Sequence, residues 1–133
     1  MKKENFLTGR KGEEIAAKFL EEKGFSIKER NFRTRFGEID IVCYDKDILV
    51  FVEVKTKIGH DFGEPEEMVG KGKLAKVQRM GEVYTLLKTQ ELKKSKTQGM
   101  ELTWEGRCRV DVVGIVLKEN GEVERIRHYE AVY

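Results

Sequence analysis

The chain has 133 residues, of which 39% are hydrophobic and 38% are charged, and its formal net charge is +2. A chain of this length and apolar content has enough material for one core, so we expect one domain over residues 1–133. Because the net charge is small, any preference for a charged partner must come from how the charges are distributed.

The sequence lacks the usual patterns of a secretion signal, a membrane span and a cysteine or histidine metal site. The amino end, MKKENFLTGRKGEE, is charged without a following apolar run, and no later segment approaches the length of a membrane span. Cys43 and Cys108 form no C-x-x-C pair, and His60 and His128 are isolated. The sequence therefore predicts a cytoplasmic protein with no membrane partner, no disulfide framework and no zinc site.

The predicted elements follow from apolar spacing. Two segments, 12–24 and 71–87, have the spacing of helices. The strand-like segments are 25–32, 37–44, 48–56, 107–117 and 123–129. The pair around the turn DKD is apolar on both faces and should be central, whereas 25–32 alternates with polar residues and should lie near an edge. This order, α-β-β-β-α-β-β, predicts an α/β fold with a mixed sheet of about five strands flanked by helices.

Basic residues gather in two places. Eight basic and two acidic residues lie between Lys71 and Lys96, and a second group, Arg30, Arg33 and Arg35, precedes the segment GEIDIV. Local positive fields of this kind suit a polyanion, although a basic run also occurs as a solvated face. We expect Lys73, Lys76 and Arg79, with Arg33 and Arg35, to contact nucleic acid.

Charged residues also interrupt the most apolar part of the chain. GEIDIV and FVEVKTK place Asp40, Glu53 and Lys55 among residues that normally line a core. A buried Asp40–Lys55 ion pair is one explanation, but burying charges costs several kcal/mol per ion, and apolar residues stabilise as well. Two converging carboxylates instead favour a Mg²⁺ or Mn²⁺ site, and an ammonium beside it favours phosphodiester hydrolysis.

A metal site that includes both Asp40 and Glu53 requires a particular length of the hairpin turn. Asp40 and Glu53 meet only if the turn has an even number of residues, either Lys46-Asp47 or the four residues 45–48. In the first helix, Glu13 falls on the side of Ala16, Ala17 and Leu20, which should face the sheet, and Glu14 falls on the polar side.

The same residues resemble a known pattern. An acidic residue on one strand followed by Glu-x-Lys on the next, here Asp40 and the EVK of residues 53–55, resembles the PD-(D/E)xK nuclease superfamily. More closely, GRKGEEIAAKFLEEKGFSIKERNFR, GEIDIV, VFVEVKTK, KGKLAKVQRMGEVY and RVDVV resemble, in order, the YraN family of predicted endonucleases, which is similar to archaeal Holliday junction resolvases. The resemblance spans residues 9–132. It departs from the pattern at Ile39, where the superfamily name has proline, and in RVDVV, where the family has RFDVV.

The resemblance implies a restriction-endonuclease-like fold and a set of roles. Asp40, Glu53 and the helix residue Glu13 would be metal ligands, and Lys55 the catalytic lysine. The implied activity is that of a Mg²⁺- or Mn²⁺-dependent endonuclease, with DNA, branched or otherwise structured, as its favoured substrate. RNA as a substrate, a binding module that no longer cuts, and assembly as a homodimer all stay open. Asp111 shares a strand face with Arg109, and we expect a structural pair there.

Overall fold

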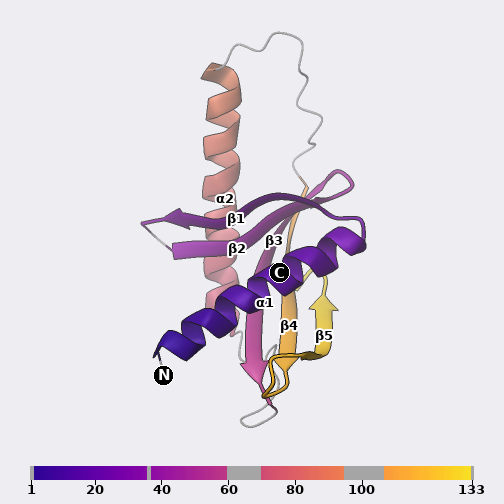
Figure 1. Ribbon diagram of the computed structural model, residues 1–133. Helices are drawn as coiled ribbons and strands as arrows, with labels where there is room; N and C mark the ends of the chain where they lie inside the picture. The colour runs from indigo at the N-terminus through magenta and orange to yellow at the C-terminus, as the bar shows by residue number, and fades with distance from the viewer. Residues whose placement is uncertain (1, 36, 60–69, 95–106, 133) are drawn as a thin grey trace.

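The computed structural model describes residues 2–35, 37–59, 70–94 and 107–132. Along the chain they form α1 (Lys2–Glu22), β1 (Ser26–Thr34), β2 (Gly37–Asp45), β3 (Ile48–Ile58), α2 (Lys71–Lys94), β4 (Cys108–Leu117) and β5 (Val123–Tyr129) (Figure 1). The predicted element order is confirmed. His60 and Gly63, which the sequence places in a loop, lie outside the described residues.

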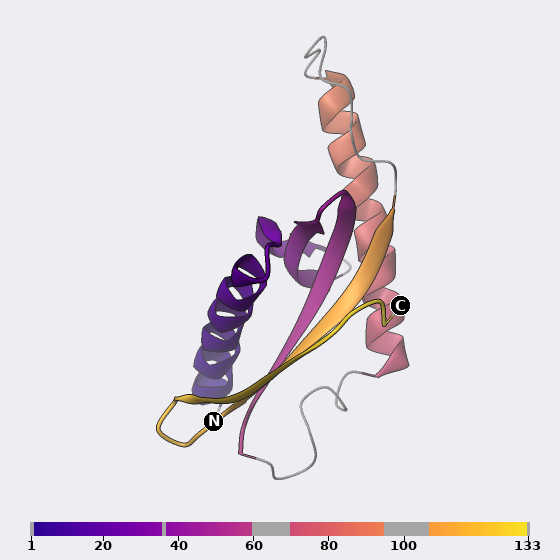
Figure 2. The same cartoon turned by 90° about the vertical axis from the view of Figure 1, so that its right-hand side faces the viewer.

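One mixed sheet organises the fold. Its strand order is β1-β2-β3-β4-β5, with β3 and β4 parallel and the other neighbours antiparallel. The sheet lies between α1 on one face and α2 on the other (Figure 2). The strand predicted at an edge, β1, is an edge strand, and β3 is the central one, so the predicted α/β architecture is confirmed.

Both helices are longer than their patterns indicate. α1 begins at Lys2 rather than at residue 12, and α2 continues to Lys94 rather than ending at residue 87. The distal half of α2 projects past the sheet (Figure 1). An apolar stripe marks only the part of a helix that packs on a sheet, so polar extensions built from good helix formers escape detection.

The β2–β3 hairpin turns through two residues. Asp45 pairs with Ile48, so Lys46 and Asp47 form the turn, and the ladder continues to Ile41 opposite Val52. This is the shorter of the two even-numbered turns that the sequence predicts. Continuing the same register places Asp40 opposite Glu53.

The core has two parts, one on each face of the sheet. On the α1 side, Ala16 and Leu20 pack against Val50, Val52 and other strand residues. On the α2 side, residues of the helix and of the strands form the second part, which consists of Ile39, Val42, Leu49, Phe51, Val77, Met80, Tyr84 and Val110. Burial on both faces explains why β2, β3 and β4 read as nearly continuous apolar runs.

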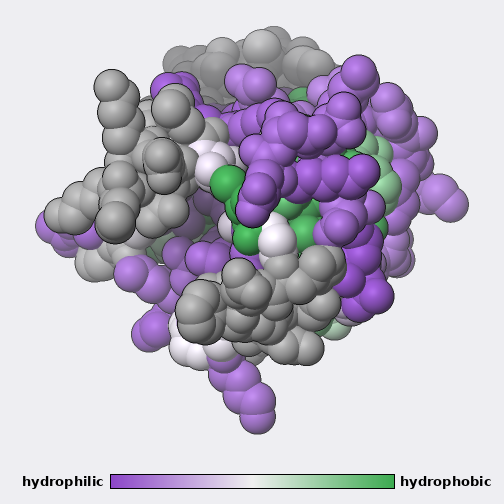
Figure 3. All heavy atoms as spheres, turned by 60° about the horizontal axis from the view of Figure 1, so that its bottom comes forward, coloured by the Kyte–Doolittle hydropathy of each residue, from purple (hydrophilic) through white to green (hydrophobic). Residues whose placement is uncertain are grey.

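Hydrophilic residues dominate one face of the described part of the molecule (Figure 3). Figure 3 shows one face on which hydrophilic residues surround a small hydrophobic area. Within the described ranges, neither helix is long and apolar enough to cross a membrane.

Glycines bring both helices close to the sheet. A Cβ placed on Gly12 of α1 would lie 2.8 Å from Thr56 Cβ on β3. One placed on Gly81 of α2 would lie 2.6 Å from Cδ2 of the Phe51 ring. Real Cβ atoms do not approach other atoms so closely. The helix axes can therefore sit this near the sheet only because these two positions lack side chains.

Gly12→Ala should destabilise the protein. The added methyl group would push α1 away from Thr56, and overpacking of this kind costs about 1–3 kcal/mol. Gly9→Ala is the matched control, because nothing lies within 4 Å of a Cβ at that position of the same helix. Removing a helix-interior glycine there should stabilise by about 0.5–1 kcal/mol. Urea unfolding of both variants measures the difference, and equal free energies of unfolding would contradict the close contact.

Candidate functional site

The candidate site lies where β2 separates from β3. The ladder between the two strands ends at the pair Ile41 and Val52, although β2 continues to pair with β1 as far as Gly37. Continued register would place Val54 opposite Ile39. Instead, the backbone N–H of Val54 donates to Asp40 Oδ2 at 2.8 Å. A side-chain carboxylate thus takes the place of a backbone acceptor at the fork between the strands.

β2 also rotates at this point. Residues two apart in a strand normally face the same side of a sheet. Ile41 belongs to the core on the α1 side, whereas Ile39 belongs to the core on the α2 side. This change of face at Asp40 explains how its side chain reaches Val54 across the fork.

The rotation brings three acidic side chains together. One carboxylate oxygen from each of Glu13, Glu38 and Asp40 lies within 4.8 Å of the others. The side-chain amide of Asn31, oriented with its nitrogen toward the acids, donates to Glu13 Oε2 at 2.9 Å and to Glu38 Oε1 at 2.7 Å. Asn31 itself has a left-handed backbone, with φ of 55°, a conformation that asparagine tolerates better than most residues.

Glu53 completes the group from the α2 side. The residue is 8% exposed, and its Oε1 lies 3.7 Å from Nζ of Lys73 on the first turn of α2. Its other oxygen, Oε2, is buried without a hydrogen-bond partner in the described part of the chain. A buried acceptor in this condition costs about 1–3 kcal/mol, so the arrangement is unfavourable without a further ligand.

Lys55 lies two residues beyond Glu53 on β3 and is partly buried. Its charge acts on Glu53, lowering the carboxyl pKa against the effect of burial. Among the described residues no ion pair joins Lys55 to Asp40. The explanation of a simple buried Asp40–Lys55 pair is therefore not what the structure shows; the ion pair with a lysine at this site is that of Glu53 with Lys73.

Burial is the largest cause of a raised pKa in Glu13, Asp40 and Glu53. Burial and the neighbouring Glu53 raise the pKa of Asp40 to about 7. Burial also raises the pKa of Glu53, against the opposing effect of Lys73, and burial with Asp40 and Glu38 nearby raises the pKa of Glu13. Acids that repel in this way are stabilised in their ionised form by a cation between them.

The donor set fits a hard divalent cation. All the side chains that converge are carboxylates, which Mg²⁺ and Mn²⁺ prefer, and the orphaned Glu53 Oε2 leaves an acceptor free for an ion or a water bound to it. Glu13, Glu38, Asp40 and Glu53 are the residues that could hold it.

Sequence reasoning named three of these four acids. Glu13 lies in the group and Glu14 is exposed, as predicted from the helical spacing. Glu38 and Asn31 were missed. Glu38 stands two residues before Asp40, but β2 changes face at Asp40, so strand alternation alone does not bring the two acids together.

The basic residues expected to contact nucleic acid do not share one environment. Arg33 is largely exposed and pairs with Glu38 at 3.3 Å, and Arg35 is exposed. Lys73 pairs with Glu53 inside the site, while Lys76 and Arg79 are exposed one and two turns further along α2. Of the five, Arg33 and Lys73 therefore contact the site's acids directly, and the basic rim consists of the exposed residues Arg33, Arg35, Lys76 and Arg79.

A second buried acid has a different environment. Asp111 is fully buried and accepts hydrogen bonds from Arg109 at 3.0 and 3.2 Å and from the backbone N–H of Ala131 at 2.9 Å. His128 Nε2 lies 2.8 Å from Asp111 Oδ2. The expected structural pair of Asp111 and Arg109 is confirmed, and His128 is structural as well.

Fold and site together define an α/β domain with a mixed five-stranded sheet and a candidate cation site at a fork between two strands, where three carboxylates cluster and Glu53 lies beside Asp40. Residues 12–115 match the model of "Uncharacterised protein family UPF0102". The chain therefore belongs to this family, as the YraN-like motifs predict.

Relatives match along most of their length. A "UPF0102 protein" of Desulforamulus reducens is 37% identical over 121 residues, which are 90% of this chain and 89% of the relative. One of Pelotomaculum thermopropionicum is 39% identical over 128 residues, 96% of this chain and 95% of the relative. One of Arthrobacter is 40% identical over 126 residues, 95% of each chain.

The raised pKa of Asp40 predicts a pH-dependent stability. A carboxyl whose pKa rises from 3.8 to about 7 on folding stabilises the fold when protonated, and that stabilisation is lost as the pH rises through 7. Asp40→Asn keeps an acceptor for Val54 and removes the charge. In chelator at pH 8 it should raise the free energy of unfolding by about 1–3 kcal/mol.

Urea unfolding at pH 5 and pH 8 checks this. The gain of Asp40→Asn over the parent protein should be clearly smaller at pH 5 than at pH 8, because Asp40 in the folded parent is then largely protonated. Glu14→Gln, which neutralises an exposed acid on α1, is the control and should change little at either pH. A gain of the same size at both pH values would show that the charge of Asp40 is not what strains the fold.

Proposed function

We propose that this protein is a metal-dependent nuclease that hydrolyses phosphodiester bonds. The observation that carries the proposal is the convergence of three carboxylates beside Glu53, which has a buried unpartnered oxygen and lies near two lysines. Glu38 and Glu53 each have one basic partner, but Glu53 Oε2 is buried without a hydrogen-bond donor in the described part of the chain, and a bound cation would supply the missing partner.

Each side chain then has a role. Asp40, Glu53, Glu13 and Glu38 would hold Mg²⁺ or Mn²⁺. Such an ion polarises a phosphate and lowers the pKa of a bound water. Lys55 would orient the attacking water or stabilise the charge that develops on the phosphate, and Lys73 would hold Glu53 in place until substrate and cation arrive.

DNA, branched or otherwise structured, is the substrate that we propose, on the strength of the resemblance to junction-resolving nucleases. The basic rim of Arg33, Arg35, Lys76 and Arg79 would supply affinity that depends on salt and little on sequence. A cytoplasmic location and assembly as a homodimer belong to the same proposal. A nucleic-acid-binding module that keeps the fold without cutting is the alternative.

Glu13→Gln and Glu38→Gln should each weaken Mn²⁺ binding about tenfold or more, because each removes a charged oxygen ligand from the group. Glu14→Gln, the exposed neighbour on α1, should bind like the parent. Isothermal titration of the metal-free proteins with Mn²⁺ gives the dissociation constants. Weakened binding in Glu14→Gln alone would mean that the acids facing the sheet do not hold the ion.

Glu53→Gln and Lys55→Ala should abolish cutting while nucleic-acid affinity stays within about threefold of the parent, because contacts with phosphates along the rim survive. The assay uses labelled duplex, single-stranded, flap and four-way-junction DNA, and matched RNA, with Mg²⁺ or Mn²⁺.

Two outcomes would count against the proposal. A parent that binds several of these substrates and cuts none in either metal would establish the binding module. Variants that cut at the parental rate would place the reaction at another site. Lys71→Ala, which removes an exposed lysine at the start of α2, is the control and should keep the parental rate.

A further inference from the structure

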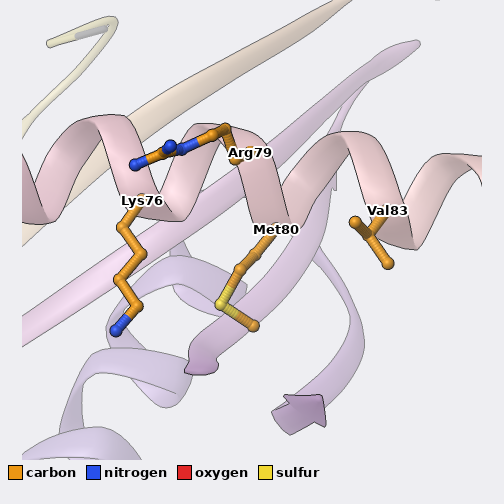
Figure 4. Close-up of a pocket in the computed structure, with 4 residues that line it drawn as sticks. All are labelled: Lys76, Arg79, Met80 and Val83. Carbon is orange, nitrogen blue, oxygen red and sulfur yellow. The ribbon is translucent and has the colours of Figure 1, made fainter. Parts of the chain in front are cut away.

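A cavity of about 430 Å³ opens on α2 beside the candidate site. The described residues that line it are Lys76, Arg79, Met80 and Val83 (Figure 4). The cavity begins at Lys76, one helical turn beyond Lys73, which pairs with Glu53.

The cavity also borders the start of β2. A Cβ placed on Gly37 would lie 2.9 Å from Met80 Sδ and 3.0 Å from Lys76 Cε. Gly37 directly precedes Glu38, one of the clustered acids. The start of β2, which leads into the clustered acids, therefore packs against two of the residues that line the cavity.

The walls differ in chemistry. Met80 is 2% exposed and Val83 is partly buried, so they form an apolar floor. Lys76 and Arg79 are exposed at the rim, and in Figure 4 the Lys76 side chain reaches out beside that of Met80. The matching ligand has an apolar body and a negative charge at its edge.

Intact duplex does not match these walls. It offers phosphates and sugars to a protein surface, while its bases stay stacked and cannot reach an apolar floor. Phosphate contacts alone would need only the cations. A nucleotide turned out of its stack has both parts, and the cavity is within the range of about 300–1,000 Å³ that small-ligand pockets occupy.

We propose that this cavity binds one unstacked nucleotide of the substrate strand, with its base against Met80 and Val83 and its phosphate on Lys76 and Arg79. The inference rests on the proposed function and narrows its substrate to nucleic acid with unpaired nucleotides beside the cleaved bond. A flexible thioether adapts to bases of different shape, and the described lining offers no amide or hydroxyl to read a base edge. Recognition is thus of unpairing and not of sequence.

The test measures binding without metal, so it does not depend on cutting. Two DNA duplexes share one strand that contains a single 2-aminopurine, and they differ only in whether the complementary strand has a thymine opposite it or lacks that nucleotide and leaves the 2-aminopurine in a bulge. In chelator the parent should bind the bulged duplex about tenfold more tightly. The emission of the unpaired 2-aminopurine should rise as it leaves the stack.

Val83→Glu should abolish both the tenfold preference and the rise in emission. A carboxylate on the floor of the cavity would repel the nucleotide's phosphate and make the apolar surface polar. Leu86→Glu is the matched control. Leu86 is 59% exposed on the same helix and is not among the lining residues, so its variant should keep the preference. Thermal melts establish that each variant folds, and Val83→Ser replaces Val83→Glu if the latter does not.

The cations should act on both duplexes alike. Lys76→Ala and Arg79→Ala should each lower the slope of log affinity against log salt by about 0.9. Equal binding of bulged and paired duplexes by the parent, or equal losses in Val83→Glu and Leu86→Glu, would overturn the inference. So would an acidic amphipathic peptide that binds in a Val83-dependent way while no oligonucleotide binds.

Failure of this inference differs from failure of the proposed function. A protein that cuts DNA in Mn²⁺ but shows no Val83-dependent preference keeps its nuclease activity and loses only the nucleotide cavity. A protein that shows the preference but cuts nothing keeps the cavity and is a binding module.

Discussion

The fork between β2 and β3, closed by Asp40, is the constraint on which the site depends. When a strand leaves its neighbour, backbone donors lose their partners, and each one that is buried costs about 1–3 kcal/mol. Asp40 accepts the N–H of Val54 and so completes the sheet with a side chain. The same carboxylate is close enough to Glu53 that their charges act on each other. Sheet pairing and site chemistry therefore share one residue.

The two helices bring further charged side chains to the fork. α1 approaches β3 through Gly12 and brings Glu13 to the clustered acids, and α2 approaches Phe51 through Gly81 and brings Lys73 to Glu53. The carboxylates consequently come from both faces of the sheet, which is possible only where the sheet is open. A continuous ladder would have kept the side chains of the α1 face and of the α2 face apart.

Much of this arrangement could be predicted from local rules. The two-residue period and the short turn at Lys46 and Asp47 fix the register, and the helical period separates Glu13 from Glu14. The rotation of β2 at Asp40 could not be predicted, because it depends on pairing with two neighbours at once. For the same reason Glu38 and Asn31 escaped notice. The pairing of Lys73 with Glu53 joins segments twenty residues apart, which no spacing rule connects.

Two aspartates, Asp111 fully buried and Asp40 partly buried, show why the fork behaves as a site and the rest of the sheet does not. Burial alone would raise the pKa of Asp111, but hydrogen bonds from His128, Arg109 and the backbone of Ala131 outweigh it and lower the pKa. Asp40 has one backbone donor and faces other acids, and its pKa rises to about 7. Burial is common to both residues, so the difference lies in their partners. A fold that fully satisfies one aspartate has the means to satisfy the other with arginine or histidine. At the fork the acids instead repel one another, and a bound cation stabilises such an arrangement.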